Sequence, residues 1–223
     1  MRFRNYLFAT LIIVSATALS YAQSSPLKRG DALVAQGNYK AAIQEYEKIS
    51  SGAGESYARA SYNIGVCYYE LWRPDVAIGF YKRAIELKEG NYPRASYALG
   101  VAYEDQGKLA EAKQAYEQSI RASRNDFASA IYKLGVLEAK SGEFKKAASL
   151  FRDAAARDGQ HRAASHNNLG VMLAQFGLLQ EAETQFVMAL KQSDGSLSDA
   201  AHNLKLCRSL MTTAQSLVPF VLL

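Results

Sequence analysis

The stretch LGVAYEDQGKLAEAKQAYEQSI, from Leu99 to Ile120, predicts two short helices joined at Gly107. Apolar residues recur every three or four positions on each side of this glycine, which is the spacing of an amphipathic helix. A helix with one apolar face must bury that face against another element. Neither helix can do so alone, so we expect this segment to be one unit among several.

Related segments recur along the chain with a period of 35 residues. One glycine of each copy, which we call the register glycine, sets the alignment: Gly30, Gly65, Gly100, Gly135 and Gly170, with Lys205 at the sixth step. Twelve residues later stands alanine, and sixteen residues later an aromatic residue: Ala42, Ala77, Ala112, Ala147 and Ala182, then Tyr46, Tyr81, Tyr116, Phe151 and Phe186. Such a period is typical of stacked helical repeats.

Each column has a physical reason. The register glycine permits close approach of two helices, and packing must offset a loss of about 1 kcal/mol in helix propensity. Seven residues later, glycines are expected to end the first helix in a left-handed conformation: Gly37, Gly107, Gly142 and Gly177. Trp72 replaces this glycine in the second copy. Proline suits the first turn of a helix, so we expect Pro74, rather than a left-handed glycine, to shape the connection between the two helices of this copy.

These columns resemble the tetratricopeptide repeat family, with Leu-Gly on the first helix and alanine, aromatic, alanine on the second. The turn AAARDGQHRAA is also similar to Sel1-like repeats. The resemblance implies an all-α, right-handed solenoid of helical hairpins within residues 23–215. Its five units lie near 23–57, 58–92, 93–127, 128–162 and 163–197, and a capping helix occupies 198–215. Arg208 replaces an apolar residue there, which predicts a polar outer face for the cap.

The N-terminus has the pattern of a secretory signal peptide. Arg2 and Arg4 precede an apolar run over residues 7–19, and small residues stand at Ser20 and Ala22. The run has 13 residues, below the roughly 18–20 that span a bilayer. We predict removal of residues 1–22 and export of the mature chain to the periplasm or cell exterior of a bacterium, with no membrane span. An uncleaved membrane anchor is the alternative.

Charge and cysteine content restrict the partners further. The formal net charge of +5 falls to +3 without Arg2 and Arg4, and no run of lysine or arginine is present, so we expect no nucleic-acid partner. Cys67 and Cys207 lie four repeats apart, whereas a disulfide needs Cα atoms within about 7 Å. Two free, mostly buried thiols are expected, with an intermolecular bridge through Cys207 as an alternative.

One face of the first helices carries the candidate binding residues. The resemblance implies that this face lines a concave groove, and its candidates are Arg59, Tyr62, Asn63, Tyr69, Arg94, Tyr97, Glu104, Tyr132, Asn167 and His202. Tyrosine and arginine are enriched in protein-binding hot spots. The alternative is that the tyrosines and the valine column, Val66, Val101, Val136 and Val171, only pack against neighbouring helices, and that the arginines are solvated.

Some tetratricopeptide repeat proteins hold a C-terminal carboxylate with a set of Lys, Asn, Asn, Lys and Arg. Only Asn63 and Arg94 match that set here, whereas Leu27, Asp31 and Ala98 do not. Asp31 would repel a carboxylate. We therefore reject this carboxylate clamp for the groove.

The sequence shows no catalytic motif, cofactor site or metal site. His161 and His166 are five residues apart and do not align on a helix, and His202 and Asn167 are interpreted as polar groove residues. We predict a non-catalytic scaffold or adaptor of the cell envelope that binds a peptide or protein. The alternatives are a peptidoglycan- or glycan-binding module and a regulator of a partner enzyme.

The apolar segment 216–223, SLVPFVLL, is too short to span a bilayer. It is expected to cover the last helix. The alternative is that it enters a neighbouring molecule and causes self-association.

Overall fold

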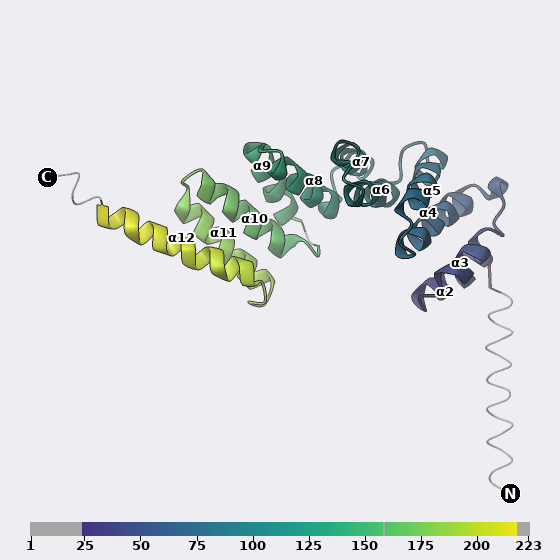
Figure 1. The fold of residues 1–223 in the computed structure, drawn as a ribbon, viewed down its shortest axis with the longest axis horizontal. Helices are drawn as coiled ribbons and strands as arrows, with labels where there is room; N and C mark the ends of the chain where they lie inside the picture. Colours follow the sequence, from purple (N-terminus) through teal and green to yellow (C-terminus); the bar gives the residue numbers. More distant parts are fainter. Residues whose placement is uncertain (1–23, 158, 218–223) are drawn as a thin grey trace, which may run out of the picture. The chain divides into compact units, whose positions relative to one another are not determined.

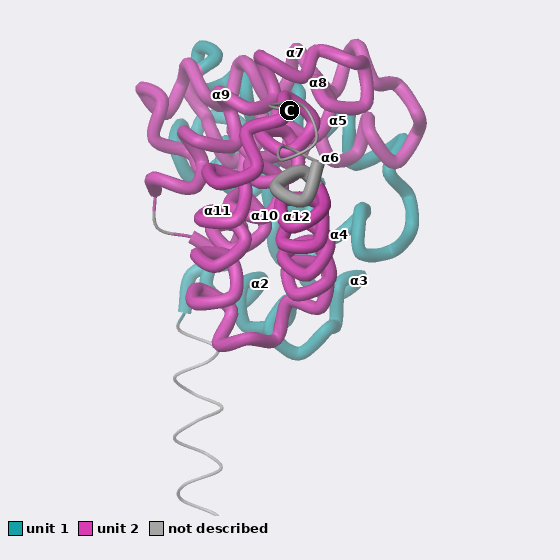
Figure 2. The backbone as a smooth tube through the Cα atoms, turned by 90° about the vertical axis from the view of Figure 1, so that its left-hand side faces the viewer, with its two compact units in different colours: residues 1–90 teal, residues 91–223 magenta. Residues whose placement is uncertain are grey.

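The computed structural model describes residues 24–157 and 159–217, in which all regular structure is helical. The predicted all-α fold is therefore confirmed for these residues. The predicted signal peptide and residues 218–223 lie outside them. The chain divides into two compact units, residues 1–90 and 91–223, which Figure 2 colours separately and which are described one at a time.

Each unit is built from pairs of helices that follow one another along the chain (Figure 1). The described part of unit 1 contains α2 (Pro26–Ala35), α3 (Tyr39–Tyr46), the short 3₁₀ helix η1 (Ser51–Ala53), α4 (Glu55–Glu70) and α5 (Pro74–Leu87). Helix α2 packs on α3, α3 also packs on α4, and α4 packs on α5.

Unit 2 repeats this scheme. It contains α6 (Pro93–Asp105), α7 (Leu109–Ala122), α8 (Ala128–Lys140), α9 (Phe144–Ala155), α10 (Arg162–Gln175), α11 (Leu179–Gln192) and α12 (Ser198–Leu217). Each second helix packs on its own first helix and on the first helix of the following repeat. None of the described helices combines the length and apolar character needed to cross a bilayer.

The register glycines hold the two helices of each pair in contact. A Cβ atom added at Gly65 would lie 2.6 Å from the ring of Tyr81, and one at Gly100 would lie 2.5 Å from the ring of Tyr116. The other register glycines meet the equivalent ring at similarly short distances: Gly30, Gly135 and Gly170. All five rings are at most 2% exposed. The predicted close approach is therefore confirmed.

The turn between the two helices takes one conformation in every repeat. Gly37, Gly107, Gly142 and Gly177 have φ between +70° and +80°, as predicted. Trp72 takes the same left-handed conformation, with φ of +59°, while its side chain is 92% exposed. The expectation that this connection would do without a left-handed residue is therefore wrong, although Pro74 does begin α5. The exposed indole meets no steric barrier, so only the local backbone strain has to be offset.

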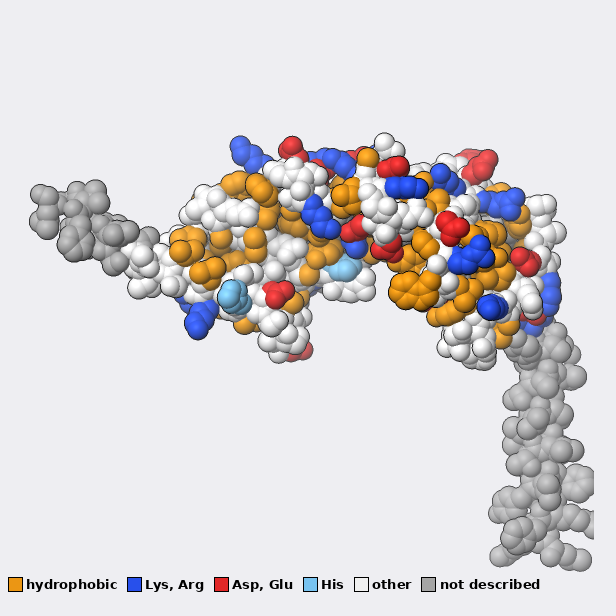
Figure 3. Space-filling view, in the orientation of Figure 1, with side chains coloured by type: hydrophobic (Ala, Val, Ile, Leu, Met, Phe, Trp, Pro, Cys, Tyr) orange, Lys and Arg blue, Asp and Glu red, His pale blue; other side chains and the backbone are white. Residues whose placement is uncertain are grey.

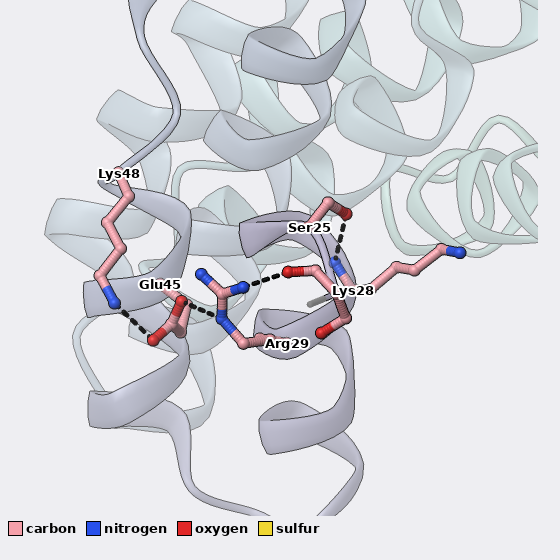
Figure 4. Close-up of polar contacts among 6 residues, drawn as sticks. Ser25, Lys28, Arg29, Glu45 and Lys48 are labelled. Carbon is pink, nitrogen blue, oxygen red and sulfur yellow. Dashed lines mark hydrogen bonds and ion pairs between the residues drawn. The ribbon is translucent and has the colours of Figure 1, made fainter. Parts of the chain in front are cut away.

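Ion pairs tie the first helix pair together (Figure 4). Ser25 caps α2 by accepting a hydrogen bond from the Lys28 backbone N–H at 3.3 Å. The Arg29 guanidinium on α2 lies 2.8 Å from Glu45 on α3, and Lys48 lies 2.5 Å from the same carboxylate. The hydrogen bond from Lys48, with that from Arg29, holds the pKa of Glu45 below its ordinary value.

A buried carboxylate joins three helices in unit 2. The side chain of Glu138 on α8 is 1% exposed and lies 2.8 Å from the Lys113 ammonium on α7 and 2.6 Å from that of Lys146 on α9. Burial by itself raises the pKa of Glu138, but the hydrogen bonds from the two lysines outweigh it and the pKa is lowered. Glu138 therefore stays ionised and fixes α8 between its neighbours.

Helix α12 differs from the predicted cap. It extends to Leu217, two residues beyond the predicted end of the cap. Arg208 lies 2.7 Å from Glu183 and so joins α12 to α11. Lys205 and Arg208, on which the predicted polar outer face rested, are both exposed. Leu206 and Leu210, which are 51% and 47% exposed, line a pocket that borders α10 and α12, so α12 also has an exposed apolar side.

Both cysteines are free and buried, as predicted. Burial raises the pKa of the Cys67 thiol to about 11. Cys207 is 2% exposed and its thiol donates to the Leu179 carbonyl oxygen at 3.2 Å. This burial disfavours the intermolecular bridge through Cys207.

Two glycine-to-alanine substitutions in unit 1 should have opposite effects. We expect Gly65→Ala to lower the free energy of unfolding by about 1–3 kcal/mol, because the new methyl group overlaps the Tyr81 ring. Gly79 lies in α5, and a Cβ atom added there would meet nothing within 4 Å, so Gly79→Ala should raise stability by about 0.5–1 kcal/mol. Urea unfolding followed by circular dichroism measures both, and an equal response of the two variants would contradict the contact described above.

Candidate functional site

Pockets lie between successive first helices at equivalent positions of the repeats. In unit 2, one of about 220 Å³ borders α8 and α10, and one of about 260 Å³ borders α10 and α12. In unit 1, a pocket of about 180 Å³ borders α2 and α4. We call the surface that carries the two pockets of unit 2 the first-helix face.

The two pockets of the first-helix face have apolar walls. The α8–α10 pocket is lined by Val136, Ala139, Lys140, Phe151, Asn168, Val171 and Met172. The α10–α12 pocket is lined by Val171, Ala174, Gln175, Phe186, Asn203, Leu206, Cys207 and Leu210. The nearly buried rings of Phe151 and Phe186 each line one pocket at the same place in the repeat, so each pocket depends on the packing of its register glycine.

A chain of side-chain amides runs between the two pockets. Asn203 on α12 donates to the Asn167 side-chain oxygen at 3.0 Å, and Asn167 donates to the Asn168 side-chain oxygen at 3.2 Å. Asn168 and Asn203 line the pockets, whereas Asn167 is only 8% exposed. Asn167, a predicted groove residue, therefore positions its two neighbours from below the surface.

The pocket of unit 1 is more polar than the two pockets of unit 2, because Asp31 replaces the valine found there in later repeats. Asp31 accepts hydrogen bonds from the Tyr46 hydroxyl at 2.8 Å and from the Asn63 amide at 2.9 Å, and Arg59 lies 2.6 Å from its other oxygen. Asn63 and Arg59 thus already have a carboxylate partner inside the protein. This arrangement agrees with the rejection of the carboxylate clamp.

Glu104 on α6 forms a similar polar cluster next to the first-helix face. Its carboxylate accepts a hydrogen bond from the buried Tyr116 hydroxyl at 2.9 Å and lies 3.2 Å from Lys133 and 3.6 Å from Lys140. Burial raises its pKa, but the Tyr116 hydrogen bond and the two lysines outweigh burial and lower it. Glu104 is therefore ionised and paired.

In four of the five repeats, the choice between tyrosine and phenylalanine in the aromatic column follows these acceptors; the second repeat has Tyr81 with Val66 and Tyr69 at the acceptor positions. Tyr46 and Tyr116 each donate to a carboxylate, from Asp31 and Glu104 respectively. In the last two repeats the residue equivalent to Glu104 is Ala139 or Ala174, and the ring belongs to phenylalanine. A buried hydroxyl without an acceptor is unfavourable, which explains the pairing.

The predicted tyrosine ladder is largely covered. Tyr97 packs against Tyr116 at 5.8 Å and Phe127 at 5.4 Å between ring centroids. Tyr132 packs against Phe151 at 5.9 Å, and His161 stacks on it at 4.5 Å with nearly parallel rings. Burial, with a contribution from Lys133, lowers the pKa of His161, so its ring is neutral near pH 7. These contacts favour a packing role for the two tyrosines.

The remaining predicted residues are spread over both units. Tyr62 is half-buried against Tyr81 at 6.0 Å between ring centroids, and Tyr69 is half-buried on the same helix. Arg94 on α6 and His202 on α12 are exposed. The described residues contain no group of three or more side chains suited to hold a metal ion.

Helical spacing alone did not reveal a column two residues before the register glycine. It contains Lys28, Asn63, Lys133, Asn168 and Asn203, with Ala98 in the third repeat, and only Asn63 was among the candidates. The pattern that could have identified this column is the recurrence of polar residues two positions before the register glycine. Helical spacing did not reveal Lys140 either, which follows Ala139, the residue equivalent to Glu104 in its repeat.

Comparisons with known proteins identify the repeat. A family model described as tetratricopeptide repeat matches residues 27–92 and 132–196, and a second of the same description matches residues 93–126. A crystal structure of MamA is similar, with a TM-score of 0.63 and 24% identity over 74% of this chain and 94% of that chain. So is YrrB, described as a TPR protein with an unusual peptide-binding site, with a TM-score of 0.61 and 24% identity over 78% and 84%. No curated protein matches the sequence.

The contact between Tyr116 and Glu104 should appear as an energetic coupling. We expect Glu104→Ala to lower the free energy of unfolding by about 2 kcal/mol, because it leaves a buried hydroxyl without an acceptor. Tyr116→Phe alone should cost about 1 kcal/mol. The double variant restores the pairing found in the last two repeats, so its loss should be about 1 kcal/mol smaller than the sum of the single losses. Additive losses in denaturant unfolding would contradict this pairing.

Proposed function

The chain belongs to the tetratricopeptide repeat family, and we propose that it is a non-catalytic scaffold that binds a peptide or protein segment on the first-helix face. The observation that carries this proposal is the pair of equivalent apolar pockets with amide side chains at Asn168 and Asn203. An extended segment needs pockets for alternate side chains and polar partners for its backbone. The first-helix face offers both.

The groups in the pocket walls are suited to binding rather than to chemistry. Aliphatic side chains, two phenylalanine rings and amides dominate them. Cys207 in the α10–α12 pocket has its pKa raised by burial, so it stays a thiol. The thiolate is the reactive form of cysteine, so Cys207 is not an activated nucleophile.

The glycan alternative needs open aromatic faces on which a sugar ring can stack. His161 stacks on one face of the Tyr132 ring and Phe127 packs at a tilt against Tyr97, so both rings are partly covered. This observation favours a peptide over a glycan as the ligand of the first-helix face.

We place the proposed scaffold in the bacterial cell envelope, as a periplasmic or extracellular protein. The support is the pattern of basic, apolar and small residues over positions 1–22, with cleavage near Ala22. That residues 216–223 cover the last helix stays a prediction, with self-association through this segment as its alternative.

A photoreactive residue placed in the α10–α12 pocket tests the proposed function. Leu206 is 51% exposed on the first-helix face, whereas Leu109 is 46% exposed at the start of α7. We expect p-benzoylphenylalanine at position 206, but not at position 109, to form a discrete protease-sensitive adduct when cells are irradiated.

The two positions are matched in residue type and exposure, so the comparison controls for random collision. Equal adducts at both positions, or a position-206 adduct that only glycan hydrolases remove, would contradict peptide binding at this face.

N-terminal sequencing of the protein purified from its native host tests the proposed location. We expect the mature chain to begin at Gln23 and to be recovered from the periplasmic or culture fraction. A chain that still begins at Met1 and sediments with membranes would instead support the anchor.

A further inference from the structure

The first-helix face changes from charged to apolar along unit 2. At the α6–α8 side, the Glu104 carboxylate lies between the ammonium groups of Lys133 and Lys140. One negative charge beside two positive charges leaves this cluster with a net positive charge. The Asp31 cluster of unit 1 pairs one carboxylate with one guanidinium, from Arg59, so its charges balance.

Lys140 connects the charged cluster to the α8–α10 pocket. Its side chain lines that pocket, is 57% exposed, and lies 3.6 Å from Glu104. An exposed ion pair of this kind contributes little free energy. Lys140 can therefore pair with a carboxylate of a bound segment while Lys133, at 3.2 Å, keeps Glu104 neutralised.

Beyond Lys140 the face becomes apolar. Among the described residues, no charged side chain lines the α10–α12 pocket, whose walls include Val171, Phe186, Leu206 and Leu210. Figure 3 shows hydrophobic side chains gathered at the surface over α10, α11 and α12, with few charged groups among them. Val171 lines both pockets, so an apolar side chain connects the α8–α10 pocket to the α10–α12 pocket.

We propose that the first-helix face selects a segment with one acidic side chain beside Lys140 and two apolar side chains in the α8–α10 and α10–α12 pockets. This inference rests on the proposed function and names the ligand class of the same site. Charge complementarity at Lys140 fixes the orientation of the segment, since its acidic end must lie toward α8. Asn168 and Asn203 face the backbone between the apolar side chains.

Fluorescence anisotropy with synthetic peptides tests the proposal. The probes are labelled peptides of about twelve residues in a glycine-serine frame, with two leucines at varied spacing and Glu, Gln or Lys at either end. We expect the best Glu peptide to bind the protein lacking residues 1–22 about threefold to fivefold more tightly than its Gln version in low salt. The Lys version should bind most weakly, and added NaCl should remove the preference.

Variants of two lysines show whether Lys140 is responsible. Lys140→Gln should abolish the preference for Glu over Gln while the affinity for the Gln peptide stays unchanged. Lys145 is also exposed but lies on α9, outside both pockets, so Lys145→Gln should retain the preference.

The outcomes separate this inference from the proposed function. If Glu and Gln peptides bind equally and both lose affinity in Leu206→Ser but not in Leu109→Ser, the acidic preference is wrong and peptide binding stands. If no leucine-containing peptide binds, or if binding ignores Leu206, both proposals fail.

Discussion

The contact between each register glycine and the aromatic ring sixteen residues later is the constraint on which the rest of the structure depends. A side chain on that glycine would occupy the space of the ring, as the distances at Gly65 and Gly100 show. The ring is therefore held against the backbone of the first helix and excluded from water. Burial of such a ring stabilises each helix pair by about 2–3 kcal/mol, which offsets the helix propensity lost at glycine.

The same contact prepares the binding surface. Because Phe151 and Phe186 are fixed by Gly135 and Gly170, they line the two pockets at the same place in successive repeats. Residues around the rings then differ without disturbing the fold. Asp31 and Glu104 place carboxylates there, whereas the last two repeats place valine and alanine, so one architecture yields polar and apolar surfaces.

Two local conflicts show how far tertiary packing overrides local preference. Trp72 adopts a backbone conformation that glycine adopts more easily, because the pairing of α4 with α5 requires that turn. Glu138 carries a charge at 1% exposure, because two lysines from α7 and α9 meet its carboxylate. Unpaired, a buried charge of this kind would be strongly unfavourable.

The sequence alone determined the repeat, the pairing of helices and the close approach at the register glycines. All of these depend on periodicity within a helix or on a fixed offset within one repeat, both of which can be read from the order of residues. The tertiary structure alone decided which residues of the first helices are open to a ligand. Tyr97 and Tyr132 are partly covered by Phe127 and His161, which directly precede the first helix of the following repeat, and the amides of Asn168 and Asn203 meet around Asn167 only after α10 and α12 stack. Exposure at these positions depends on contacts between repeats, which the helical period of one repeat does not specify.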